Sequence, residues 1–167
     1  MVLPADALID LDLDSSNGGI YISDIRGNTL NMETSNGPLV LDNVSADRIT
    51  GITSNGGIEG TVEAPDTSLS TSNGGISLTL PCSISGQYAL STSNGNVKLN
   101  VASLPEVGYD LDLSTSNGDI DIALSGLEYS QNQKTSKEAQ SEGYSNKAVQ
   151  IVIEASTSNG NIDVETS

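Results

Sequence analysis

The side chains in this sequence that could do chemistry are carboxylates, because the chain of 167 residues has 22 Asp and Glu, no His and one Cys. Without histidine there is no imidazole to act as a general base, to activate a serine or cysteine nucleophile, or to bind a metal ion. The glycines never form a Gly-x-Gly-x-x-Gly segment and none precedes Lys-Ser or Lys-Thr, so no phosphate-binding loop is predicted. We predict that the protein is not an enzyme and needs no cofactor.

The carboxylates alternate with apolar residues in several segments. Asp10, Asp12 and Asp14 are separated by leucines, as are Asp110 and Asp112. A β-strand would send each such set of carboxylates to one face, away from the core. We interpret these faces as solvated acidic surface that keeps the protein soluble and discourages association at sheet edges.

Asp121 and Asp163 are the candidate metal ligands. They occupy equivalent positions after two successive Asn-Gly pairs, so stacking of the two units would bring their like charges to about 5 Å from each other. Carboxylate oxygens suit Ca²⁺, and Ca²⁺ is the cation that this pair would bind. The favoured expectation is still a solvated acidic surface without a metal.

Aromatic side chains are scarce, since the chain has five Tyr, no Phe and no Trp. A carbohydrate-active β-helix enzyme that works with carboxylates is an alternative to a binding module, but few rings are available to stack on sugars. Tyr88 stands at an apolar position, where a packing role is expected. Tyr129 and Tyr144 lie in a polar, irregular segment and are the candidate contacts with a partner. Cys82 is expected to act as a small apolar residue.

A repeated Ser-Asn-Gly triplet must position these side chains. It occurs seven times, with its asparagines at Asn17, Asn36, Asn55, Asn73, Asn94, Asn117 and Asn159. The successive spacings are 19, 19, 18, 21, 23 and 42 residues, which predicts a repeat protein with units of roughly 20 residues. The last spacing fits one unit plus an insertion, and the polar segment at about 128–147 is predicted to be a loop or disordered.

Apolar residues keep fixed distances from each triplet. Three residues after the asparagine stand Ile20, Leu39, Ile58, Ile76, Val97, Ile120 and Ile162. Five residues after it an aliphatic residue recurs in every unit except one, which has Gly60, and in several units apolar residues stand four and six residues before it. This period of two predicts one β-strand on each side of the triplet. Segments 26–28, 45–47 and 65–66 predict a second turn in each unit.

Two architectures fit this pattern. Asn-Gly between alternating strands is typical of a β-hairpin, so an antiparallel meander remains open. A β-solenoid is favoured because Thr precedes Ser-Asn-Gly in six units and only Ser15 departs. In a solenoid, equivalent Asn, Ser and Thr side chains stack at a spacing of about 4.8 Å and can hydrogen-bond to the coils on either side. We predict an all-β fold with one β-solenoid domain over residues 1–167, about seven coils, a ladder of the seven asparagines, and the insertion before the last coil.

Charge and hydropathy restrict the partners. The formal net charge is −16, which disfavours binding to nucleic acid and to anionic lipid. The hydrophobic fraction of 35% and the lack of Phe and Trp predict a thin aliphatic core. No apolar run approaches the ~20 residues of a membrane span, and the N-terminus lacks the basic region of a signal peptide. Either the protein is cytosolic or the sequence begins after a removed signal or anchor.

The two ends of the predicted stack would expose unpaired strand edges. Met1–Ala7 are expected to cap the first coil. Ser167 follows Asn159 by only eight residues, so the last coil is expected to be poorly covered and to offer a surface for end-to-end self-association. A cytosolic scaffold that assembles in this way is a further alternative.

Two of the units resemble the hallmark of a bacterial putative-adhesin family, a domain of unknown function built from β-strand repeats with a Thr-Ser-Asn-Gly-x-Ile turn. They are Thr71-Ser-Asn-Gly-Gly-Ile-Ser-Leu and Thr115-Ser-Asn-Gly-Asp-Ile-Asp-Ile. The resemblance covers about residues 9–164, and only the insertion departs from regular spacing. It implies a β-solenoid domain without a catalytic motif, in proteins associated with the cell envelope. We therefore expect a non-catalytic structural or adhesion module that presents an acidic, elongated surface to a protein or carbohydrate outside the cell.

Overall fold

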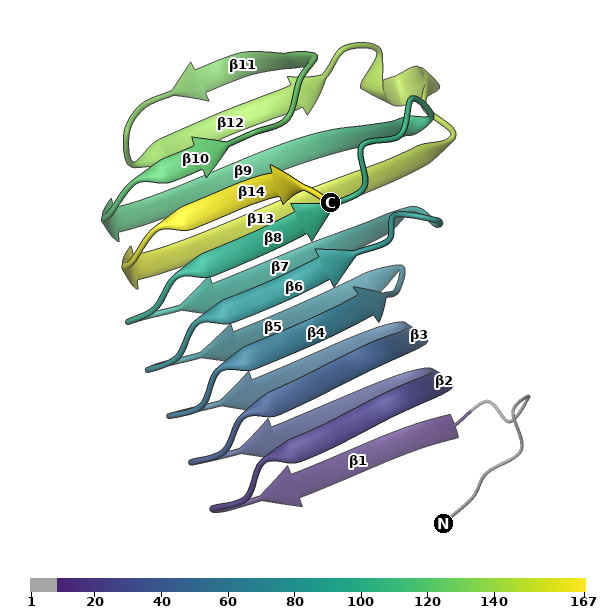
Figure 1. The fold of residues 1–167 in the computed structure, drawn as a ribbon, viewed down its shortest axis with the longest axis vertical. Coiled ribbons are helices and arrows are strands. Elements are labelled where there is room, and N and C mark those ends of the chain that lie inside the picture. The colour runs from purple at the N-terminus through teal and green to yellow at the C-terminus, as the bar shows by residue number, and fades with distance from the viewer. Residues whose placement is uncertain (1–8) are drawn as a thin grey trace.

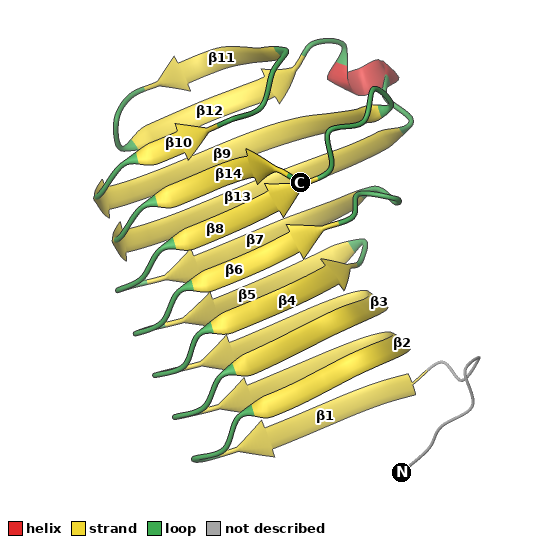
Figure 2. Cartoon of the chain, viewed as in Figure 1, coloured by secondary structure: helices red, strands yellow, loops and turns green. Residues whose placement is uncertain are grey.

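A computed structural model describes residues 9–167, and the expected cap at Met1–Ala7 lies outside the described residues. The chain winds repeatedly between a front layer and a back layer of strands, as seen in Figure 1, and forms a β-solenoid-like stack. The fold is all-β. Over the described residues its only helical segment is the short 3₁₀ turn η1 (Tyr144–Asn146), shown in Figure 2.

The strands divide between the two layers. The front layer contains β4 (Ile58–Glu63), β6 (Ile76–Leu80), β8 (Val97–Val101), β10 (Ile120–Ile122) and β14 (Ile162–Thr166). The back layer contains β1 (Ile9–Ser15), β5 (Asp66–Thr71), β7 (Gly86–Thr92), β9 (Val107–Asn117), β11 (Leu127–Asn132), β12 (Ser136–Ser141) and β13 (Val149–Asn159). Two long strands, β2 (Ile20–Thr34) and β3 (Leu39–Thr53), run through both layers. All of these strands belong to one hydrogen-bonded sheet that folds over on itself.

Neighbouring units pair in parallel and in register. In the front layer, Ile20 pairs with Leu39, which in turn pairs with Ile58. These positions, three residues after each asparagine, are buried in every unit. Because equivalent residues stack directly on one another, each unit adds one layer to a continuous aliphatic core. This parallel pairing contradicts the antiparallel meander, in which each Asn-Gly would join two paired strands.

The second turn of the first two units differs from the prediction. Segments 26–28 and 45–47 lie inside the continuous strands β2 and β3. The chain bends slightly earlier, at Asp24 and Asn43, whose φ angles are 53° and 54°. Asp and Asn tolerate this left-handed conformation better than most residues. Asn43 Nδ2 also donates a hydrogen bond to Asp24 Oδ1 at 2.8 Å, so the two bends are linked.

The last coil does not lie at the end of the stack. β13 pairs with β7 on one side and with β9 on the other, and β14 lies in the same way between β8 and β10, as Figure 1 shows. The coil that carries the seventh triplet is thus inserted between those of the fifth and the sixth. The expectation that this coil is poorly covered is wrong, because each of its strands has a parallel neighbour on both sides.

The segment at about 128–147 is not a loop. β11 and β12 form an antiparallel hairpin, β12 pairs antiparallel with β9, and η1 follows the hairpin. Ala139 of β12 is buried and pairs with Leu111 of β9. The hairpin therefore extends the back layer beyond β9, the last parallel strand of that layer. The outer edge of the hairpin is antiparallel, so it does not offer the parallel pairing that the repeat units use.

The core is mostly aliphatic, with a small polar cluster inside it. Tyr88 is only 1% exposed, which confirms its predicted packing role, and Cys82 is buried as expected. The Tyr109 hydroxyl donates a hydrogen bond to the Ala102 carbonyl and lies 3.5 Å from Cys82 Sγ. Burial raises the pKa of Tyr88 to about 12 and also raises the pKa of the Cys82 thiol. These groups therefore remain neutral in the core at neutral pH.

Candidate functional site

A group of carboxylates lies on the outer face of the back layer, where β13, β9 and the hairpin meet. Glu154, Asp112 and Glu138 occupy paired positions on three adjacent strands. Asp110 shares their face, because the residue between Asp110 and Asp112 is the buried Leu111. We name as the acidic face five residues: Asp110, Asp112, Glu128, Glu138 and Glu154.

Part of the acidic face is hollowed. Asp110, Asp112, Glu128 and Glu138 line a shallow hollow of about 520 Å³, and no Lys or Arg is among its lining residues. Gln140 Nε2 donates to Asp110 Oδ2 at 3.1 Å, and Ser130 Oγ donates to Glu138 Oε2 at 3.1 Å. The remaining lone pairs of these carboxylates can accept hydrogen bonds from carbohydrate hydroxyls or pair with Lys and Arg of a protein.

The structure does not bring the two candidate tyrosines together. Tyr129 pairs with the buried Ala139, so its ring lies on the core-facing side of the hairpin, where it is 40% exposed. Tyr144, in η1, is half-buried and lies over Gly108, at which an added Cβ would come within 3.0 Å of the ring. Burial and the nearby Asp110 raise the pKa of Tyr144. Tyr144 thus packs on the back layer, and Tyr129 is the more accessible of the two.

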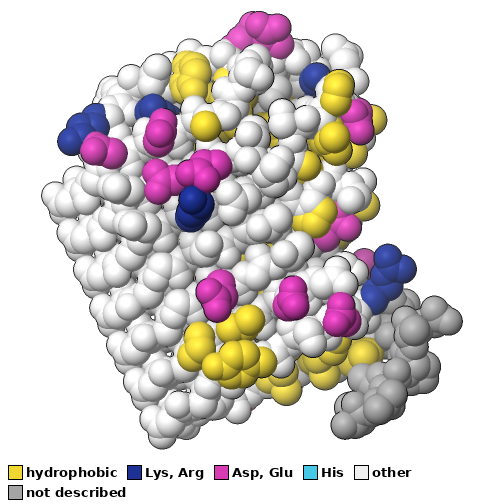
Figure 3. All heavy atoms as spheres, in the orientation of Figure 1, with side chains coloured by type: hydrophobic (Ala, Val, Ile, Leu, Met, Phe, Trp, Pro, Cys, Tyr) yellow, Lys and Arg dark blue, Asp and Glu magenta, His cyan; other side chains and the backbone are white. Residues whose placement is uncertain are grey.

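Asp121 and Asp163 lie side by side on β10 and β14, because the inserted coil is the neighbour of the sixth one. Burial, the charge of Asp121 and that of Glu165 raise the pKa of Asp163, while Lys98 on its other side lowers it. Lys98 also forms an ion pair with Glu165 at 3.0 Å. Figure 3 shows this mixture of acidic and basic side chains on the upper part of the front face. Over the described residues, no three His, Cys, Asp or Glu side chains come close enough together to hold a metal ion.

The corner asparagines form one continuous hydrogen-bonded ladder. Six of the seven Nδ2 atoms donate to Oδ1 of the neighbouring asparagine, at distances of 2.8–3.0 Å. In spatial order the ladder runs through Asn17, Asn36, Asn55, Asn73, Asn94, Asn159 and Asn117. The same Nδ2 groups also donate to a serine carbonyl of the neighbouring corner, at 3.0–3.5 Å. The ladder therefore has a direction, in which each of these six amide nitrogens points toward the N-terminal end of the stack.

The threonines before the triplets tie adjacent corners together. Their Oγ1 atoms donate to a glycine carbonyl of the neighbouring corner at 2.8–2.9 Å, from Thr34, Thr53, Thr71, Thr92, Thr115 and Thr157. Ser15, the one exception, has no preceding corner among residues 9–167. Its Oγ instead accepts a hydrogen bond from the Gly18 N–H at 3.0 Å. The single departure from Thr in the sequence therefore falls at the first corner among the described residues.

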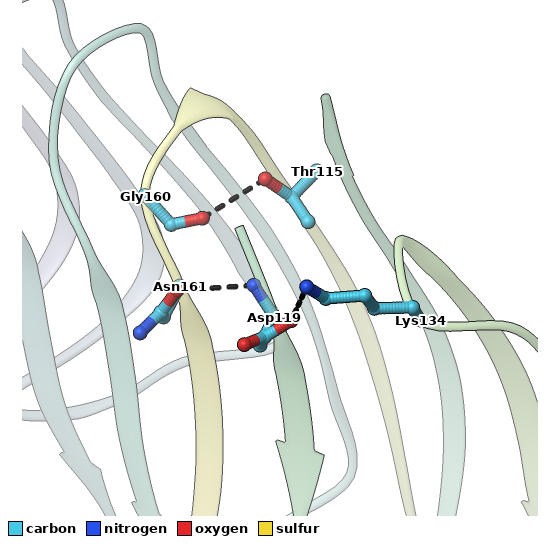
Figure 4. Close-up of polar contacts among 5 residues, drawn as sticks. All are labelled: Thr115, Asp119, Lys134, Gly160 and Asn161. Carbon is cyan, nitrogen blue, oxygen red and sulfur yellow. Dashed lines mark hydrogen bonds and ion pairs between the residues drawn. The ribbon is translucent and has the colours of Figure 1, made fainter. Parts of the chain in front are cut away.

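At the opposite end, the hairpin holds the corner of the sixth unit. Lys134 Nζ lies 2.8 Å from Asp119 Oδ1, and the Asp119 N–H donates to Asn161 Oδ1 at 3.0 Å, as drawn in Figure 4. Thr115 donates through its hydroxyl to the Gly160 carbonyl and through its N–H to the Thr135 carbonyl. This corner is thus fixed by the inserted coil on one side and by the hairpin on the other.

The sequence pattern does not predict the acidic face as a group. Asp110 and Asp112 show the alternation of a strand, but Glu128 and Glu138 fall within the segment predicted to be a loop. A weak signal was available, because Leu127 and Tyr129 alternate with polar residues at the start of that segment. Nothing in the pattern indicates that β12 pairs with β9, since this pairing depends on the path of the chain around the inserted coil.

The corner ladder, the aliphatic core and the outer carboxylates together define an all-β repeat domain of the β-solenoid-like class. Comparison with protein families is more specific: the chain belongs to the family described as Toastrack DUF4097, whose model matches residues 6–165. This match supports the predicted resemblance to an adhesin-like family of unknown function. Among curated proteins, none matches the sequence.

Among solved structures, the chain is similar to a putative cell adhesion protein from Clostridium sporogenes, with a TM-score of 0.63 and 8% sequence identity. The similarity covers 100% of this chain and 97% of that one. At this identity the two chains share a fold. Neither the family description nor that of the similar structure names a catalytic activity. No helix in the part of the chain that the structure describes is long and apolar enough to cross a membrane.

Proposed function

We propose that the protein is a non-catalytic adhesion or binding module of the bacterial cell envelope. The seven coils act as a single β-solenoid, and the acidic face binds a protein or carbohydrate at the cell surface. Membership of the Toastrack family and the fold shared with a putative cell adhesion protein support this function. The elongated stack would hold the acidic face at a fixed distance from whatever anchors the module.

The acidic face carries the proposal. Its carboxylates lie on the adjacent strands β13, β9, β12 and β11 of one hydrogen-bonded sheet, so their spacing is set by backbone hydrogen bonds and not by a flexible loop. Asp112, Glu138 and Glu154 are exposed, and no Lys or Arg is among the residues that line the hollow. An arrangement of this kind favours recognition of hydroxyl-rich or basic surfaces through charge-assisted hydrogen bonds.

Binding of the full chain to a panel of surface glycans and to a lysine-rich peptide tests the proposal. The triple variant Asp112→Asn, Glu138→Gln, Glu154→Gln should lose at least about tenfold in affinity for whichever probe the chain binds, since charge-assisted hydrogen bonds are lost. The glycans should be recovered intact. Release of shortened products by the chain would contradict the non-catalytic function.

A matched control removes the same number of charges at the other end of the molecule. The triple variant Asp10→Asn, Asp12→Asn, Asp14→Asn neutralises three exposed carboxylates on β1. We expect it to bind as the unchanged chain does. Equal losses from the two triple variants would mean that binding follows net charge alone and would contradict a role for the acidic face.

A further inference from the structure

The seven Asn-Gly pairs have a chemistry that the proposed binding function does not use. In such a pair the glycine nitrogen can attack Cγ of the asparagine. The N–Cγ bond forms, the Cγ–Nδ2 bond breaks, and Nδ2 leaves as ammonia with the proton of the attacking nitrogen. Water then opens the five-membered succinimide at either carbonyl and leaves an aspartyl or an isoaspartyl residue. Glycine favours the attack because it has no side chain to obstruct the approach.

The ladder restrains this reaction at six of the seven corners. There the leaving nitrogen, Nδ2, donates both of its hydrogens, one to a neighbouring asparagine and one to a serine carbonyl. The side chain must give up both hydrogen bonds before Cγ can turn toward the glycine nitrogen. The corner glycines are also closely stacked: a Cβ at Gly74 would lie 2.1 Å from the Gly56 carbonyl oxygen. The backbone at these corners therefore has little room to move.

Asn17 is held differently. Over residues 9–167 its Nδ2 donates to no acceptor, and its side chain only accepts a hydrogen bond, from Asn36 at 3.0 Å. Gly18 is exposed, and an added Cβ there would meet only the Ser15 hydroxyl, at 3.2 Å. The direction of the ladder is the cause, because every amide nitrogen reaches toward the preceding corner and Asn17 begins the series.

We propose that Asn17 is a site of spontaneous deamidation and that the ladder protects the other six corner asparagines. The aspartyl product at position 17 keeps the ladder intact, since its side-chain carboxylate still accepts from Asn36 Nδ2, now with charge assistance. At Asn73, by contrast, loss of Nδ2 would set a carboxylate against Asn55 Oδ1, two acceptors without a proton between them. Deamidation is thus expected at one end of the ladder, where it adds one negative charge beside β1.

Peptide mapping of the folded chain tests the proposal. After incubation in a mildly alkaline buffer, trypsin cleavage at Arg26, Arg48 and Lys98 leaves Asn17 as the only asparagine of peptide 1–26. Asn55 and Asn73, in peptide 49–98, are matched controls because they share the sequence Ser-Asn-Gly-Gly with Asn17. Mass spectrometry should find deamidation at Asn17 at least about tenfold faster than at either control, the difference expected from two lost hydrogen bonds. Equal rates in the folded chain would overturn the proposal.

Two further measurements separate the ladder from the local sequence. In denaturant, Asn17, Asn55 and Asn73 should react at similar rates, and a persistent excess at Asn17 would assign the effect to sequence and overturn the proposal. The variant Asn55→Ala removes the Oδ1 that accepts from Asn73 Nδ2. Provided circular dichroism shows that the variant is folded, deamidation should rise several-fold at Asn73 and stay unchanged at Asn94. An unchanged rate at Asn73 would contradict protection by the ladder.

Discussion

From β1 to β8 each coil lies on the coil that precedes it in the chain, whereas from β9 to β14 chain order and spatial order separate. The two regions nevertheless use the same parallel register and the same asparagine ladder. The comparison teaches that the repeat specifies how a coil contacts a neighbour and leaves open which coil that neighbour is. Since equivalent corners offer the same donors and acceptors, the connections decide the order.

The connections of the C-terminal region place the coils in an order that differs from their order in the chain. Segment 102–106 carries the chain from β8 to β9 past the position of one coil, and the hairpin and η1 bring it back to fill that position. Lys147, after η1, donates to the Pro105 carbonyl at 2.8 Å, so the outgoing and returning connections contact each other. The inserted coil is thus supported on both faces, whereas β1 is supported on one.

The largest expected difference between the regions comes from the core of the inserted coil. Ile153 of β13 is fully buried between Tyr88 and Leu111 of the flanking strands. We expect Ile153→Ala to lower the free energy of unfolding by about 2–5 kcal/mol, through lost transfer energy and the cavity left behind. Urea unfolding measures this change. Leu11→Ala on the half-buried strand β1 should cost clearly less, and equal losses would contradict the view that the inserted coil is the better supported one.

The corner glycines provide a second comparison, between the interior of the stack and its N-terminal end. Gly74→Ala would place a Cβ 2.1 Å from the Gly56 carbonyl oxygen, and the three nearest atoms all belong to the backbone of Gly56 and Gly57, so no flexible side chain can yield. We expect a loss of about 3 kcal/mol from this overpacking. Gly18→Ala meets only a serine hydroxyl at 3.2 Å and should be nearly neutral. Thermal unfolding of both variants checks the contrast, which fails if the two melting temperatures fall equally.

The regular region is the part of the fold that the sequence predicted well. The aliphatic residues at Ile20 and its equivalents, and the Thr before six of the seven triplets, recur because stacked coils require similar residues at each level. The acidic face was missed because it depends on contacts between β13, β9 and the hairpin, which no local pattern specifies. The meander was excluded only by the parallel pairing. The bends at Asp24 and Asn43 were misplaced because a left-handed residue can turn a strand without the Gly or Pro that a turn prediction relies on.

A third comparison sets the interior of the ladder against its start. Asn73→Ala removes two hydrogen bonds donated by Asn73 and the acceptor used by Asn94. Since each bond contributes roughly 0.5–1.5 kcal/mol net, and solvent can replace part of this at an exposed corner, we expect a loss of about 1–2 kcal/mol in chemical unfolding. Asn17→Ala removes one accepted bond and should cost less than half as much. The opposite ranking would show that the corner asparagines stabilise the stack through something other than the ladder.

The smallest expected effect concerns the carboxylate pair that the inserted coil brings together. Burial and Asp121 raise the pKa of Asp163 above its ordinary value, so the folded state takes up this proton more readily than the unfolded state. Above this raised pKa the charged Asp163 carboxylate therefore lowers the free energy of unfolding. The loss disappears as the pH falls through the folded-state pKa and Asp163 becomes protonated. Because Asp163 is only partly buried and Lys98 offsets part of the repulsion, Asp163→Asn should stabilise the protein at neutral pH by only a few tenths of a kcal/mol.

Unfolding measured at neutral and at acidic pH checks this sign, with Asp12→Asn as the control, since Asp12 pairs with the neutral Asn31. The gain from Asp163→Asn should vanish at acidic pH, where both states are protonated, and should shrink in high salt. A loss of stability at neutral pH would mean that attraction to Lys98 outweighs repulsion by Asp121. In that case the attraction between Lys98 and Asp163 would make the row Lys98, Asp163 and Asp121 favourable for folding.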